Sequence, residues 1–177
     1  MSRIPYQPSD LNDPKGLIDE IRERRGGQLY NLDRMLLHSE AFTRGWHGFL
    51  PAVRSDLSVD KKLAELAICV VAVINKAEYE FHHHAPVFIA CGGSEDQLHA
   101  IRSLDTATKN ARLFSDAEVA TIHLTMEMTR SVEVSDDTFD AIKTILGNER
   151  ELVELIGVIA AYNMVSRFLV ALGVEPE

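Results

Sequence analysis

The chain has 177 residues, of which 46% are hydrophobic, enough to bury the core of one globular domain. Its 18 lysines and arginines against 27 aspartates and glutamates give a formal net charge of −9. An acidic chain without a basic stripe is poorly suited to bind nucleic acid phosphates, and it lacks the cationic face of a peripheral membrane protein. We therefore expect neither a nucleic-acid partner nor a membrane partner.

The N-terminal residues 1–14 are polar and include three prolines. They lack the apolar segment of a signal peptide, and no part of the chain reaches the run of about 18 apolar residues that a transmembrane helix needs. We therefore expect an irregular leader over residues 1–14, a single all-helical domain over residues 15–177, and a cytoplasmic location.

Apolar residues recur at helical spacing from the start of this domain. They predict one helix around residues 17–21 and a second over residues 29–36. A third helix is expected to carry Phe42 and Trp46 and to end before Pro51, because proline removes a backbone donor and clashes with the preceding turn.

The middle of the chain predicts two helices in succession. Ser58 is expected to cap a long apolar helix over residues 59–75. The next helix covers residues 79–90, and Gly92 and Gly93 provide its C-terminal stop.

The second half of the chain continues the helical pattern with clear start signals. A serine followed three residues later by Glu or Gln forms a capping box at Ser94 and at Ser115, and Ser135 and Asn148 are further N-caps. The predicted helices run from these caps to about residue 103, to about residue 130, onward from residue 135, and over residues 150–172, with a polar linker over residues 105–112. Because no segment reads convincingly as a strand, the predicted fold class is all-α, with about eight or nine helices.

Three residues in the middle of the chain form a candidate proton-transfer site. Glu80 and His84 are four residues apart and share one helix face, where the carboxylate can orient the imidazole. Glu65 lies on the preceding apolar helix and can approach His84 if the two helices pack antiparallel. The alternative is a pair of ordinary charges on an exposed helix, where Glu–His pairs at this spacing are common.

Three consecutive histidines, at positions 82, 83 and 84, suggest metal binding at first sight. Neighbouring residues on a helix point about 100° apart, so these side chains cannot converge on one ion. We therefore expect no metal, and we interpret His82 and His83 as solvent or interface residues.

The run Glu65…Glu80-x-x-x-His84-x7-Gly92 resembles the carboxymuconolactone decarboxylase / alkylhydroperoxidase D superfamily, most strongly over residues 57–104. The resemblance implies an all-helical fold, a homo-oligomer (a trimer or hexamer) and catalysis without a cofactor. It also implies roles for three residues: His84 would donate a proton to carbon, Glu80 would orient it, and Glu65 would hold a second proton or fix the imidazole.

The sequence departs from the peroxidase branch of this superfamily at two positions. That branch carries Cys-x-x-Cys where this chain has Ala77 and Glu80, so the disulfide cycle cannot run there. Cys69 and Cys91 do not replace the pair by spacing. The resemblance therefore favours a lyase that acts on a small carboxylate or lactone.

Candidate substrate-binding residues come from the two ends of the chain. Tyr162 and Arg167 fall together near the end of the last helix, where the arginine could hold a substrate carboxylate. Trp46 belongs to an N-terminal extension that could line the pocket. The alternative for all three is helix packing with a surface arginine.

Two further functions are compatible with the sequence. One is a thiol-dependent antioxidant that uses Cys69 or Cys91, which the superfamily alone suggests. The other is a non-enzymatic helical oligomer or binding protein, suggested by the apolar helices.

Overall fold

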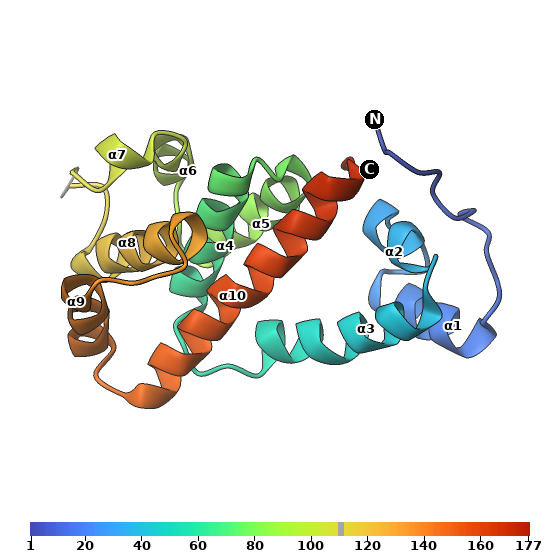
Figure 1. Cartoon of the computed structure of the whole chain (residues 1–177), viewed down its shortest axis with the longest axis horizontal. Helices are drawn as coiled ribbons and strands as arrows, with labels where there is room; N and C mark the ends of the chain where they lie inside the picture. Colours follow the sequence, from blue (N-terminus) through green and yellow to red (C-terminus); the bar gives the residue numbers. More distant parts are fainter. Residues whose placement is uncertain (110–111) are drawn as a thin grey trace.

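The computed structural model describes residues 1–109 and 112–177, and all of their regular structure is helical (Figure 1). This described part of the chain forms nine helices of six or more residues, together with the four-residue helix α7. The helices are α1 (Lys15–Arg24), α2 (Asn31–Leu36), α3 (Glu40–Ser55), α4 (Lys61–Asn75), α5 (Glu78–Ala90), α6 (Glu95–Ile101), α7 (Leu104–Ala107), α8 (Asp116–Arg130), α9 (Asp136–Leu146) and α10 (Glu149–Leu172). The all-α prediction is confirmed.

Helix α4 is the centre of the bundle and packs against α5, α8 and α10. Its sequence from Leu63 to Ala72 is almost entirely apolar, and nearly all of these side chains are buried. The helix ends at Lys76, which adopts a left-handed conformation with φ of 58°, and α5 starts two residues later. This short connection folds α5 back along α4, as in a helical hairpin.

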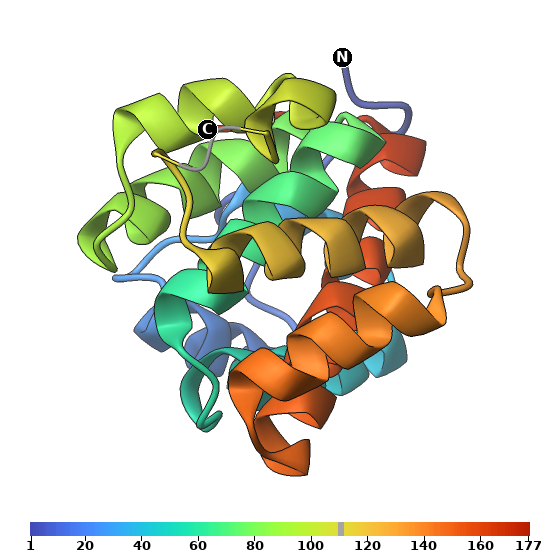
Figure 2. The ribbon, with the colours of Figure 1, turned by 90° about the vertical axis from the view of Figure 1, so that its left-hand side faces the viewer.

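Helix α10 crosses the molecule between the N-terminal helices and the α8–α9 end (Figures 1 and 2). It is the one helix in the described chain that is long and apolar enough to span a membrane by length and composition. Half of its most apolar window is buried inside the protein, against neighbours that include α3, α4 and α9. This burial is typical of the central helix of a bundle.

The N-terminal helices α1–α3 form one end of the molecule, with a small core of their own around Leu17, Ile18 and Ile21. Residues 1–14 contain no helix, but they contact the rest of the chain: the Arg3 amide donates to the Leu172 carbonyl at 2.8 Å. This contact joins the start of the chain to the end of α10.

Several predicted helix boundaries were wrong. Helix α3 continues through Pro51 to Ser55, because proline removes only one hydrogen bond from a helix that buried Trp46 and Leu50 anchor before the proline and partly buried Val53 anchors after it. Asp60 rather than Ser58 caps α4, by accepting from the Lys62 amide at 2.7 Å.

The predicted linker over residues 105–112 overlaps α7, and its residues 110 and 111 lie outside the described part of the chain. The caps at Ser94, Ser115, Ser135 and Asn148 are confirmed, and so is the helix end at Gly173.

The end of α5 depends on a glycine that packs against an aromatic ring. A Cβ atom at Gly93 would come within 2.3 Å of the Phe88 ring, which is fully buried in the core. Gly93 donates its amide to the Phe88 carbonyl at 2.9 Å, so the chain cannot move away without losing this bond.

We expect Gly93→Ala to lower the free energy of unfolding by about 1–3 kcal/mol, because the added methyl group overpacks the Phe88 site. Gly157→Ala is the matched control: no atom outside its own helix lies within 4 Å of a Cβ there, so this change is expected to be neutral or stabilising by up to about 1 kcal/mol. Chemical denaturation of both variants measures the difference, and equal stabilities would contradict the packing argument.

Candidate active site

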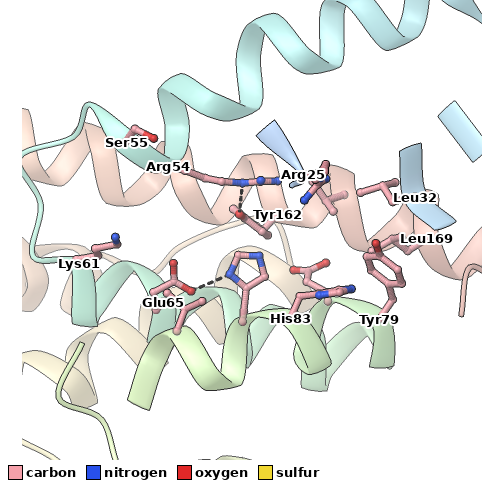
Figure 3. A pocket seen from close by; sticks show the side chains of 14 residues that line it. Arg25, Leu32, Arg54, Ser55, Lys61, Glu65, Tyr79, His83, Tyr162 and Leu169 are labelled. Atoms are coloured by element: carbon pink, nitrogen blue, oxygen red, sulfur yellow. Dashed lines mark hydrogen bonds and ion pairs between the residues drawn. The ribbon is translucent and has the colours of Figure 1, made fainter. Parts of the chain in front are cut away.

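A cavity of about 340 Å³ opens between α4 and α5 on one side and α3 and α10 on the other (Figure 3). Its wall combines acids, bases and cations with apolar side chains. The lining residues are Arg25, Leu32, Arg54, Ser55, Lys61, Glu65, Tyr79, Glu80, His83, His84, Val87, Tyr162, Val165 and Leu169. The three residues of the predicted proton-transfer site therefore line one cavity.

Glu65 and His84 form the central pair of this cavity. The Nδ1 atom of His84 lies 2.7 Å from Glu65 Oε2, and both side chains are mostly buried. In this geometry Nδ1–H donates to the carboxylate, which fixes the tautomer and leaves Nε2 to exchange a proton with a ligand. The edge of the imidazole also meets the Tyr162 ring, at 4.9 Å between centroids.

Glu80 is buried in the same cavity wall without a partner. Its side chain lies on the first turn of α5, the residue is 2% exposed, and neither carboxyl oxygen has a hydrogen-bond partner. Burial raises the pKa of Glu80 well above its ordinary value, and the positive charge of Arg54 opposes this rise. Glu80 is therefore suited to be a neutral acid that donates a hydrogen bond.

The predicted orienting role of Glu80 is not what the structure shows. A hydrogen bond from His84 Nδ1 goes to Glu65 instead, across the α4–α5 interface. The i,i+4 spacing put Glu80 on the right helix face, but the buried acid on the neighbouring helix is the one that meets the imidazole.

Arg54 is the cation that sequence reasoning missed. It lies on the last turn of α3, and its Nε donates to the Tyr162 hydroxyl at 2.9 Å. Figure 3 shows it reaching from α3 toward Tyr162 on α10, with Arg25 on the same side of the cavity and Lys61 at the opposite end. Because α3 was expected to end before Pro51, Arg54 was placed outside any helix and was not predicted as a site residue.

Two of the three predicted substrate-binding residues do not line this cavity. Arg167 turns back along α10 and donates to the carbonyl and the side chain of Asn163. Trp46 is 4% exposed and packs against Phe42 and Phe168. Tyr162 does line the cavity, and burial raises the pKa of its hydroxyl well above the ordinary value.

His83 was expected at the surface or at an interface, but it lines the cavity. Its Nε2 lies 3.0 Å from Glu177 Oε2, and its ring packs against Tyr79 and Tyr30. Burial lowers the pKa of His83, although Glu177 opposes this shift. His82, by contrast, is exposed.

Neither cysteine is placed for chemistry in this cavity. Cys69 is fully buried in the core beside α4's other apolar residues, and burial raises the pKa of its thiol, as do the carboxylates of Glu65 and Glu80. Cys91 is partly buried just after α5, away from the lining residues. In the described part of the chain, no group of three or more His, Cys, Asp or Glu side chains is placed to hold a metal ion.

No protein-family profile and no curated protein sequence matches the chain. Solved structures do match it. An uncharacterized peroxidase-related protein from Silicibacter sp. TM1040 has a TM-score of 0.78 at 16% identity, covering 99% of this chain and 90% of its own. An alkylhydroperoxidase AhpD core, an uncharacterized peroxidase-related protein from Ralstonia eutropha JMP134, has a TM-score of 0.78 at 16% identity, with 99% and 92% covered.

A third match is a cysteine-to-alanine variant of the debrominase Bmp8 in complex with 2,3,4-tribromopyrrole. It has a TM-score of 0.74 at 13% identity, and the match covers 100% of this chain and 94% of that one. At such identities the likeness establishes the architecture and not the activity. The protein has the all-helical AhpD-like fold of the peroxidase-related proteins.

Proposed function

We propose that the protein is a cofactor-independent lyase or isomerase that acts on a small carboxylate or lactone by proton transfer. The observation that carries this proposal is the 2.7 Å contact between His84 Nδ1 and Glu65 in the wall of a 340 Å³ cavity. A buried carboxylate–imidazole pair beside a ligand-sized space is a usual arrangement for general acid–base catalysis.

Substrate binding in this proposal depends on the cations of the cavity. Arg54 and Lys61 line it, and within the described chain Arg54 makes no ion pair with a carboxylate. A guanidinium that donates only its Nε–H, to a neutral tyrosine hydroxyl, can still bind a carboxylate in bidentate geometry through its remaining N–H groups. The cavity therefore suits a small organic anion.

Proton transfer is assigned to His84. In a decarboxylation, the bond between the carboxylate carbon and its neighbour breaks, carbon dioxide leaves, and the electron pair delocalises onto a lactone or acyl carbonyl as a dienolate. The Nε2–H of protonated His84 then gives its proton to carbon, while Glu65 stabilises the positive charge on the ring. Solvent restores the proton after product release.

Glu80 supports the same chemistry as a hydrogen-bond donor. A neutral carboxyl group can donate its O–H to the carbonyl oxygen where negative charge develops, with no like-charge repulsion of the anion. Both Glu80 oxygens lack a hydrogen-bond partner among the described residues, so a bound substrate would satisfy a buried group that the protein itself does not.

The alternatives are less well supported by this cavity. Thiol-dependent peroxidase activity needs an accessible thiolate, but Cys69 is buried near two acids and Cys91 lies outside the cavity wall. Oxidation of either cysteine by mild peroxide, detected by mass spectrometry, would favour that alternative. The Bmp8 complex supports small-molecule binding by this fold.

The superfamily resemblance implies a homo-oligomer, a trimer or hexamer, under each of these functions, so the oligomeric state does not distinguish between them.

We expect the purified protein to turn over carboxymuconolactone or a related unsaturated carboxylate, followed by ultraviolet absorbance. His84→Ala should reduce kcat by about 10²- to 10⁴-fold, because it removes the proton donor. His82→Ala is the matched control on the same helix, and it should retain activity because that side chain is exposed. Turnover that survives in His84→Ala would contradict the mechanism, and no turnover in any variant would reject the substrate class tested.

Glu65→Gln tests the charge of the pair separately from its shape. The amide can still accept the hydrogen bond from Nδ1, but it no longer stabilises a positive imidazole. We expect kcat to fall about 10- to 100-fold with little change in KM, as for the loss of one charge-assisted hydrogen bond. A change confined to KM would assign Glu65 to substrate binding instead.

The neutral state of Glu80 predicts a pH-dependent stability. Burial raises the pKa of Glu80 in the folded chain above the ordinary 4.5 of the unfolded chain, so between the two pKa values folding takes up a proton and stability falls as pH rises. From about pH 5 upward, we expect the wild-type protein to lose on the order of 1 kcal/mol of unfolding free energy per pH unit relative to Glu80→Gln, until folded Glu80 ionises as well.

Denaturant titrations across this pH range measure the difference, with Glu78→Gln as control, because Glu78 is an exposed acid on the same turn. Parallel pH curves for wild type and Glu80→Gln would show that Glu80 is ionised in the folded protein.

A further inference from the structure

A second cavity of about 190 Å³ lies beside the first and collects positive charge. Its charged and titratable lining consists of Arg24 and Arg25 at the end of α1, together with His47 and Arg54 on α3. We call these four residues the arginine pocket. Arg25, Arg54 and Ser55 line both cavities, so the two are neighbours.

The arginine pocket holds more positive charge than its partners neutralise. Arg25 is paired with the buried carboxylate of Asp33, through bonds of 3.0 and 3.2 Å. Arg54 bonds to the neutral Tyr162 hydroxyl, and Arg24 Nε bonds to the Glu20 carbonyl oxygen at 3.4 Å. Three guanidinium groups thus line the pocket, and no carboxylate is among its described lining residues, in a protein whose formal net charge is −9.

Carboxylates also lie outside this pocket. Glu20 and Glu23 line the adjoining groove with Arg24, Arg44 and His47, but no ion pair between them and Arg24 exists in the described structure. The groove therefore mixes acids with cations, whereas the arginine pocket has cations and no acid among the lining residues that the structure describes.

The pKa of His47 responds to the positive charges of the pocket. Its Nε2 is buried without a hydrogen-bond partner, 3.6 Å from the nearest Asp33 oxygen. Burial lowers the pKa of His47 to about 4, and the charges of Arg24, Arg25 and Arg54 contribute to the decrease. His47 therefore adds no positive charge of its own at neutral pH, and the charge of the pocket comes from its three arginines.

We propose that the arginine pocket binds an oxyanion, the carboxylate, sulfate or phosphate group of a small molecule. Guanidinium groups match such oxygens in bidentate geometry, and the volume admits one such group rather than a whole metabolite. The inference goes beyond the proposed function, because it concerns a separate pocket and is tested by binding rather than by turnover.

Two consequences follow for the neighbouring cavity. A bound anion would partly neutralise Arg54, whose charge opposes the raised pKa of Glu80, so it would favour the neutral form of Glu80. It would also draw a proton onto His47, so anion binding should strengthen as pH falls. The carboxylate of Asp33 would repel a bound anion, but its charge is already paired with the guanidinium of Arg25.

The test is a titration of the purified full chain with sodium sulfate at constant ionic strength, followed by the NMR signals of the His47 ring. Sulfate keeps its charge across the working pH range, so proton uptake can be assigned to the protein. We expect saturable shifts of His47, a higher His47 pKa with sulfate bound, and tighter binding at lower pH. Acetate in place of sulfate distinguishes a carboxylate site from a site for tetrahedral oxyanions.

Arg24→Gln should weaken sulfate binding about tenfold, as expected for the loss of one charged hydrogen-bond donor. Arg44→Gln is the matched control: it lies on α3, pairs with Glu40 at the surface and does not line the arginine pocket, so binding should be unchanged. Equal weakening in both variants would mean nonspecific screening, and unsaturated or absent shifts of His47 up to about 0.1 M sulfate would exclude the site. Either result overturns the proposal without bearing on the catalytic one.

Discussion

Glu65 needs a partner because it lies on the most deeply buried helix of the protein. A carboxylate among apolar side chains is costly unless it is hydrogen-bonded or paired. The partner is His84, which the tight α4–α5 connection brings to 2.7 Å. The same packing that buries α4 therefore fixes the position and tautomer of the imidazole, because the carboxylate that holds the ring belongs to the central helix of the bundle.

The distribution of charge supports the proposal that this site binds a small anion. The chain as a whole is acidic, but Arg25, Arg54 and Lys61 gather where the N-terminal helices meet α4 and α10. A positive opening on a negative molecule focuses small anions toward it and repels them elsewhere. Burial disfavours the charged form of Glu80, and the second acid in the described cavity wall, Glu65, is paired with His84.

Most of the helical framework could be predicted from the sequence, because caps and periodicity are local signals. The Ser94 and Ser115 capping boxes and the hairpin that unites Glu65 with His84 are of this kind. The cavity's cations are not local. Arg54 depends on α3 continuing past Pro51, which tertiary packing decides and the proline signal opposes.

The final helix shows a second limit of sequence reasoning. Tyr162 and Arg167 seemed to belong together because they are close in sequence, yet five residues rotate a helix by about 140° beyond one turn, so they face different sides. Which side meets the cavity is set by the neighbours of α10. Tyr162 faces the bundle interior, and Arg167 folds back onto Asn163.

The acids of the cavity also bear on the choice between thiol and proton chemistry. Burial raises the pKa of the nearby Cys69 thiol, and the carboxylate of Glu65 adds to the rise because a negative charge disfavours a thiolate. The same surroundings favour species that hold a proton: a neutral carboxyl at Glu80 and an imidazole that shares its N–H with Glu65. In the peroxidase branch of the superfamily that the sequence resembles, a cysteine stands at the position of Glu80. A carboxyl group at this position can donate a proton but cannot attack peroxide as a thiolate does. The side chains of the cavity are therefore better suited to proton transfer than to peroxide reduction.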